Sequence, residues 1–138
     1  MTKVFLATLL IFSAGHCFGD IAIIAHPSAN TSNLTQETVR DLYLGNRQYV
    51  AQTRFIPLDQ DGDSKIRQVF YERLIDKPEN QVISHWSRLI FTGKGQAPIS
   101  LTGDNSIIQF VKNNPNVIGY VDKDFVDETI KVVFVLNE

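Results

Sequence analysis

The stretch 106-SIIQFVKNNPNVIGYVD-122 contains one helix and the strand that follows it, and it sets the fold class. Asp104 or Asn105 is predicted to cap the helix, because a short polar side chain can accept hydrogen bonds from the free N–H groups of a first turn. Pro115 ends the helix, since proline has no backbone N–H to continue it. The apolar run after it predicts a buried strand at 116–122. A helix that leads straight into a buried strand is typical of an α/β domain.

The rest of the chain alternates in the same way between apolar runs and helical periodicity. Thr35 is predicted to cap a helix that Gly45 ends, because Thr favours the N-cap and Gly the left-handed C-cap position. Pro57 lies inside an apolar run and predicts an edge strand or a bend there. Strands are predicted at 20–27, 54–59, 116–122 and 130–137, and helices at 36–45, 64–75, 79–93 and 106–114. This order predicts one α/β domain over residues 20–138, with a mixed sheet and helices on its faces.

Composition is that of an ordinary soluble domain. The 138 residues are 43% hydrophobic and 20% charged, and this length is enough for one domain with its own core. The formal net charge of −2 provides no basic field, so no nucleic-acid partner is expected. No apolar run after residue 19 is long enough to span a membrane. Because no catalytic set, metal-ligand spacing or cofactor motif is present, we expect a non-enzymatic protein without metal or cofactor.

The first nineteen residues, 1-MTKVFLATLLIFSAGHCFG-19, are predicted to be a secretory signal peptide. Lys3 precedes an apolar run that is too short to cross a membrane, and small residues follow it. Cleavage at its end places residues 20–138 in the periplasm or the medium. Cys17 raises a lipoprotein alternative, but His16 stands where a lipid-attachment signal needs a small residue. Cleavage removes the only Cys, so we expect no disulfide or thiol chemistry.

An acidic segment, DQDGD, begins at Asp59 in the manner of a calcium-binding EF-hand loop. Asp59, Asp61 and Asp63 match the first, third and fifth loop positions. Ser64 and Phe70, however, stand where that motif has Gly and a bidentate Glu. Calcium binding at the three aspartates is therefore the minor interpretation, kept because clustered carboxylates repel one another and attract a cation. The main interpretation is a strand–loop–helix junction in which Asp63 caps the helix that follows.

Four segments carry a family resemblance. They are LTQETVRDLYLGNRQYV (34–50), DQDGDSKIRQVFYERL (59–74), SHWSRLIFTGKGQAP (84–98) and SIIQFVKNNPNVIGYVD (106–122). Together they resemble the periplasmic phosphate-binding proteins of ABC importers, within the type II periplasmic binding protein class, and NPNVIGYV is their most specific part. Members of that family clamp the ligand between two α/β lobes, whereas this chain has room for one. The resemblance therefore implies a single-lobe member, whose missing wall a second copy or another protein would supply.

The resemblance also implies a site for phosphate or another small anion at the N-terminus of the helix that begins near residue 64. The backbone N–H groups and the dipole of a helix N-terminus attract anions. Lys94 is expected to line the same surface. The implied ligand-binding residues are Gly62, Asp63, Ser64, Lys65 and Arg67, together with Ser28 in the loop after the first strand.

The acidic loop departs from the family pattern. Asp59 stands where the family has an Arg, and Asp63 stands where it has a Ser. A carboxylate at these positions repels phosphate. Two hypotheses therefore follow: an exported solute-binding domain, or a non-enzymatic accessory module that has kept the fold and binds another protein.

Overall fold

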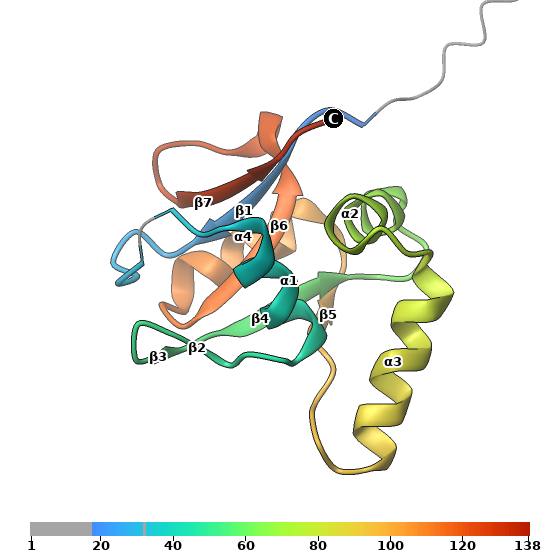
Figure 1. Cartoon of the computed structure of the whole chain (residues 1–138). Helices are drawn as coiled ribbons and strands as arrows, with labels where there is room; N and C mark the ends of the chain where they lie inside the picture. The colour runs from blue at the N-terminus through green and yellow to red at the C-terminus, as the bar shows by residue number, and fades with distance from the viewer. Residues whose placement is uncertain (1–17, 32) are drawn as a thin grey trace, which may run out of the picture.

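The computed structural model describes residues 18–31 and 33–138, so nearly all of the predicted signal peptide lies outside the described residues. Its elements are β1 (Ile21–Ala25), α1 (Gln36–Leu44), β2 (Tyr49–Val50), β3 (Thr53–Arg54), β4 (Ile56–Gln60), α2 (Lys65–Ile75), α3 (Glu79–Phe91), β5 (Ile99–Leu101), α4 (Gly103–Asn113), β6 (Val117–Asp122), the short 3-10 helix η1 (Lys123–Phe125) and β7 (Lys131–Leu136) (Figure 1). Among the described residues, no helix is both long enough and apolar enough to cross a membrane.

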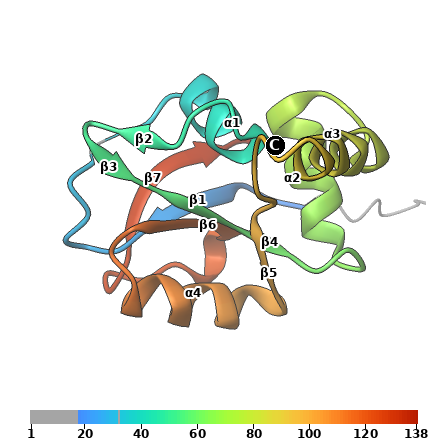
Figure 2. The same ribbon diagram turned by 90° about the horizontal axis from the view of Figure 1, so that it is seen from below.

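The main sheet is mixed, which confirms the predicted α/β class. Its strand order is β5-β4-β6-β1-β7. β4 runs parallel to β5 and β6, while β1 runs antiparallel to β6 and β7. Helices cover both faces: α1, α2 and α3 lie on one side of the sheet and α4 on the other (Figure 2).

β1 lies at the centre of two hydrophobic cores because its side chains alternate between the faces of the sheet. Ile21, Ile23 and Ala25 belong to the core under α1, α2 and α3. Ala22 and Ile24 belong to the core under α4. All five are fully buried, which explains why the sequence of this strand is a continuous apolar run.

A glycine in the motif at 117–121 lets α4 pack closely on the sheet. A Cβ atom built on Gly119 would lie 2.5 Å from Cγ2 of Ile107, a distance that real side chains do not tolerate. The residue type is therefore required by helix–sheet packing, and this accounts physically for the Gly in the most specific part of the resemblance.

The helix starts follow their caps, with two corrections. Thr35 caps α1 as predicted, and its side chain accepts a hydrogen bond from the N–H of Thr38. Ser64, rather than Asp63, is the N-cap of α2. α4 begins at Gly103, after Thr102, and so Asp104 lies inside the first turn. Neither Asp104 nor Asn105 is therefore the N-cap, and the carboxylate of Asp104 instead accepts a hydrogen bond from the side chain of Gln60, 2.6 Å away.

The strand around Pro57 is internal, so the edge expectation was wrong. The N–H of Ile56 donates to the carbonyl of Asn116 beside β6. The missing N–H of Pro57 therefore faces the opposite side, where pairing with β5 begins one residue later, at Leu58. The proline thus removes no hydrogen bond of the sheet.

Short elements of the fold were not predicted from the sequence. They are β5 and the β2–β3 hairpin with its two-residue turn, Ala51–Gln52.

Candidate functional site

A buried carboxylate lies at the carboxyl end of β4, beside the N-terminus of α2. Asp59 is 3% exposed. Its two oxygens accept hydrogen bonds from the hydroxyls of Tyr71, at 2.6 Å, and Tyr120, from the backbone N–H of Gln60, at 2.8 Å, and from Nε of Arg67, at 3.2 Å. Every partner is a donor, so the carboxylate is fully satisfied without solvent.

Arg67 joins this network to the next helix. Its Nη1 donates to Oε1 of Glu79 at the start of α3, while its Nε contacts Asp59. The guanidinium carbon also lies 5.4 Å from the ring centroid of Tyr71. One cation is therefore shared between two carboxylates, and these three groups together carry a net negative charge when all are ionised.

The two tyrosines act as neutral hydrogen-bond donors. Burial raises the pKa of Tyr71 well above its ordinary value, and the charge of Asp59 raises it further. The same two causes raise the pKa of Tyr120. Partial burial is the largest single cause and lowers the pKa of Arg67, but the charge and hydrogen bond of Asp59, together with Tyr71 and Glu79, outweigh it, so the net shift is upward. All three groups thus keep their protons and hold the buried carboxylate in place.

An outer polar layer covers the network. The side chain of Gln60 donates to the carbonyl of Tyr120 as well as to Asp104. Partial burial raises the pKa of Asp104, and the hydrogen bond from Gln60 partly offsets that rise. The hydroxyl of Thr102 donates to the carboxylate of Asp61. These contacts tie the loop after β4 to the start of α4 and present carboxylates at this end of the sheet.

Of the six residues that the resemblance placed around an anion, five lie together in the acidic loop and the first turn of α2, and Ser28 does not. Gly62, Asp63 and Lys65 are exposed in and after the acidic loop. The Ser64 hydroxyl accepts the hydrogen bond that caps α2, from the N–H of Arg67. Arg67 is committed to its two carboxylates.

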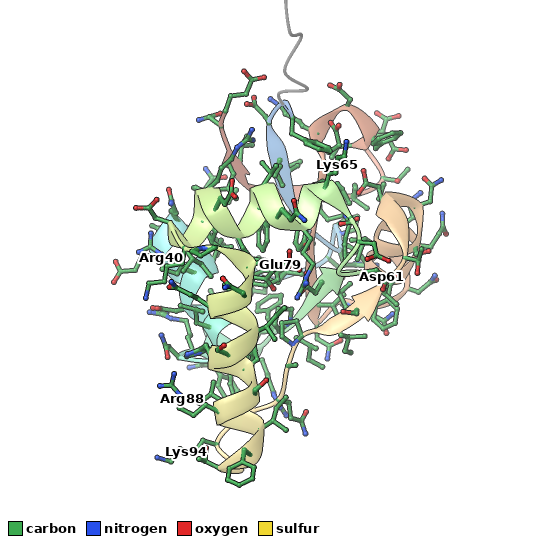
Figure 3. The ribbon with its side chains drawn as sticks, turned by 90° about the vertical axis from the view of Figure 1, so that its right-hand side faces the viewer. Arg40, Asp61, Lys65, Glu79, Arg88 and Lys94 are labelled. Atoms are coloured by element: carbon green, nitrogen blue, oxygen red, sulfur yellow. The ribbon has the colours of Figure 1, made fainter. Side chains whose placement is uncertain are left out.

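Ser28 lies at the other end of the sheet. It follows β1, which runs antiparallel to β6, whereas β4 runs parallel to β6. The end of β1 is therefore opposite the end of β4, and the Ser28 hydroxyl contacts Nδ1 of His26 at 2.7 Å. Lys94 also lies far from Lys65, at the far end of α3 (Figure 3), so the expectation of one shared surface was wrong.

The positions of the three aspartates argue against calcium binding in this loop. Both oxygens of Asp59 are occupied by protein donors, and Asp61 is held by Thr102. In the part of the chain that the structure describes, no three acidic, His or Cys side chains are grouped so that they could hold a metal ion. The three aspartates alternate in sequence, but they do not converge.

Sequence reasoning missed three members of the network around Asp59 and Arg67. Tyr71 and Glu79 come from two successive helices, and Tyr120 comes from β6. The signal that could have found Tyr71 is its place on the buried side of α2, one position after Phe70. Glu79 had no such signal, because its approach to Arg67 depends on the angle between α2 and α3.

Comparisons with known proteins agree with this fold. No protein-family model matches the sequence, and no curated protein matches it. A solved structure assigned as a phosphate ABC transporter substrate-binding protein from Clostridium perfringens, with bound phosphate, has a TM-score of 0.65 and 22% identity over 84% of this chain and 45% of its own. An ABC-type phosphate transport receptor from Vibrio cholerae has a TM-score of 0.64 and 14% identity over 84% of this chain and 46% of its own. PstS from Borrelia burgdorferi has a TM-score of 0.57 and 17% identity over 75% of this chain and 41% of its own.

The resemblance read from the sequence is thus confirmed as a likeness of fold to phosphate-binding proteins of ABC importers. This chain spans less than half of the length of each of those solved chains.

Proposed function

We propose that the chain is an exported, non-enzymatic binding lobe of the phosphate-binding-protein type, which works in the periplasm or medium against a second protein surface. The observation that carries the proposal is the commitment of Arg67 to Asp59 and Glu79. The guanidinium of Arg67, in the first turn of α2, is thereby paired with carboxylates and is not available to bind phosphate at that end.

The surrounding charges support this view. Asp61 and Asp63 lie in the loop just before α2, and like charges there oppose a phosphate more strongly than one helix N-terminus attracts it. Lys65 is exposed, and a single exposed ammonium contributes little net attraction in water. The loop therefore serves to join β4 to α2 rather than to enclose an anion.

A protein partner is supported by the outer face of α3. Ile83, Ile90 and Phe91 are 47%, 54% and 93% exposed. Large apolar side chains that are exposed together on one helix mark contact surfaces. The partner is a second copy or another protein that lies against this lobe, as the second lobe does in a two-lobed binding protein.

A second candidate function is small-anion binding, with phosphate as its first case. It is favoured by the fold neighbour from Clostridium perfringens, whose structure holds bound phosphate. The residues concerned are the exposed Gly62 and Lys65, the cap residue Ser64, and the N–H groups of the first turn of α2.

The test is thermal unfolding of the purified chain with phosphate, with calcium and with neither. A ligand that binds only the folded state raises the melting temperature once its concentration exceeds the dissociation constant. We expect no rise with either ion. A rise with phosphate that Lys65→Gln abolishes would overturn the proposal in favour of the second candidate, and Lys77→Gln is the matched control because Lys77 lies outside the loop.

The partner is tested separately by light scattering over a range of concentrations. A dimer that Phe91→Ser dissociates would identify the partner as a second copy. A monomer at every concentration would exclude a second copy as the partner. Tyr49→Ser is the control, because Tyr49 is 56% exposed and lies on β2, away from α3.

A further inference from the structure

A hollow lies at the opposite end of β4 from Asp59. It is bounded by the end of α1, the β2–β3 hairpin, the start of β4, α3 and the segment 93–97, which returns from the far end of α3 to β5 (Figure 1). We call this segment the strap and the hollow the strap pocket. Its volume is about 510 Å³, within the range of roughly 300–1,000 Å³ that small-molecule sites occupy.

The floor of the strap pocket is apolar. Leu42, Phe55 and Trp86 line it and are 2%, 3% and 7% exposed. Gly45 lets the chain approach the Trp86 ring closely, because a Cβ atom built on it would lie only 3.0 Å from Cη2, and Gly95 packs at ordinary contact distance from the same ring. The floor is therefore shaped by the indole ring and can bury a hydrocarbon group of a ligand.

The rim of the strap pocket is cationic. Arg47, Arg54 and Lys94 line it and are exposed, and the lining contains no Asp or Glu. Within the described residues, none of the three side chains is held by an ion pair or by a side-chain hydrogen bond. This arrangement is unexpected in a chain with a formal net charge of −2. The three positive charges thus remain available to a ligand.

The apolar floor and the cationic rim of the strap pocket together fit one class of ligand. Arg guanidinium groups bind carboxylates through two parallel hydrogen bonds, and two of the three rim cations are Arg. The side chains of Gln48 and Gln96 add amide donors at the same rim. An inorganic anion would leave the apolar floor unused, and a neutral hydrocarbon would leave the cations unused.

We propose that the strap pocket binds small organic carboxylates, with the hydrocarbon body on Trp86 and Phe55 and the carboxylate between Arg47, Arg54 and Lys94. This site is independent of the proposed function, because it lies at the other end of β4 from the Asp59 network. Figure 3 shows how far apart the two ends are, with Lys94 at the far end of α3 and Asp61 beside α2.

The protein carries its own reporter for this site, because Trp86 is the single Trp of the chain and lies in the floor. The experiment titrates the purified chain with 3-phenylpropionate and follows Trp86 fluorescence. We expect a saturable change with 3-phenylpropionate, and binding roughly tenfold weaker for 3-phenylpropionamide, which has the same body without the charge. Inorganic phosphate should bind more weakly than 3-phenylpropionate.

Variants locate the site. Arg54→Gln and Lys94→Gln should each weaken 3-phenylpropionate binding about three- to tenfold while leaving the melting temperature unchanged, because both side chains are exposed. Arg88→Gln is the matched control, since Arg88 is an exposed cation on α3, the helix that carries Trp86, but lies outside the strap pocket. The proposal is overturned by an absence of saturable binding, by equal binding of the amide or of phosphate, or by a loss that follows Lys65→Gln instead of Arg54→Gln.

Discussion

The two ends of β4 use charge in opposite ways. At the carboxyl end, Asp59 is buried and accepts only from protein donors, and Arg67 is held between two carboxylates. At the amino end, Arg54 and its neighbours on the rim of the strap pocket are exposed and contact no carboxylate. The first end holds the fold together, whereas the second leaves charge available for a ligand.

This difference shows that likeness of fold does not fix where a ligand binds. The fold neighbours are described as phosphate-binding proteins. In this chain, however, the junction of β4 and α2 is an internal network whose charges are already satisfied. A buried, fully satisfied polar network makes a structure rigid and specific, but it has no bonding capacity left for an anion.

The largest expected effect is at the Asp59 end. Asp59→Ala removes the acceptor of the Tyr71 and Tyr120 hydroxyls and leaves Arg67 partly buried beside Glu79 alone. We expect it to lower the free energy of unfolding by about 3–5 kcal/mol, because removal of one member of a buried charge network leaves the others unpaired. Urea unfolding measures this change.

The matched control for Asp59→Ala is Asp63→Ala. Asp63 is exposed four residues further along, and its removal should change the free energy of unfolding by no more than about 0.5 kcal/mol. If the two variants unfolded at the same urea concentration, Asp59 would not anchor the network and the contrast between the two ends of β4 would disappear.

Local signals were enough to predict most of the fold. The Thr35 cap, the proline after α4 and the fully apolar β1 each act within a few residues, and the α/β class follows from their order. β5 has three residues and the β2–β3 turn lacks the Asn-Gly or Asp-Gly pair that marks such hairpins, so neither gave a local signal.

The sites depend on long-range contacts, which is why sequence reasoning could not place them. Asp59 aligned with a family Arg, at a position where a carboxylate was expected to repel phosphate. Instead it points into the core, toward Tyr71 and Tyr120, which lie 12 and 61 residues away. A change of Asp59 to Arg would therefore bury a second cation beside Arg67 and would not rebuild a phosphate site. The rim of the strap pocket likewise comes from separate elements and has no sequence motif.

A smaller effect is expected from pH, and it also belongs to the Asp59 end. The pKa of Tyr71 and that of Tyr120 are raised in the folded state by burial and by Asp59. Above about pH 10 the unfolded chain loses these protons while the folded chain keeps them, so stability is complete below that pH and falls as the pH rises. Tyr71→Phe should reduce this fall by about 1 kcal/mol between pH 10 and 11, measured by urea unfolding, because the unfolded tyrosine goes from half to almost fully ionised over that range.

Tyr49→Phe is the control for the pH prediction, since Tyr49 is exposed and lies outside the network. The comparison uses the slope with pH rather than the stability at neutral pH, because Tyr71→Phe also removes a hydrogen bond to Asp59. Equal slopes for the two variants would contradict the view that Asp59 holds Tyr71 in its neutral form.

The smallest expected effect is at the strap pocket end, in the β2–β3 turn that precedes Arg54. Gln52 has a φ of +72°, a left-handed conformation that costs a side-chain-bearing residue about 1–2 kcal/mol. Gln52→Gly relieves this strain but adds about 0.5–1 kcal/mol of unfolded-state entropy, so we expect a net gain of about 0.5–1 kcal/mol in urea unfolding. Thr53→Gly is the control, because Thr53 lies in β3 outside the left-handed region and the same entropy should lower stability there. If both variants lost stability equally, the turn would carry no strain.

Unchanged 3-phenylpropionate binding by a stabilised Gln52→Gly variant would show that Arg54 is already placed for its ligand.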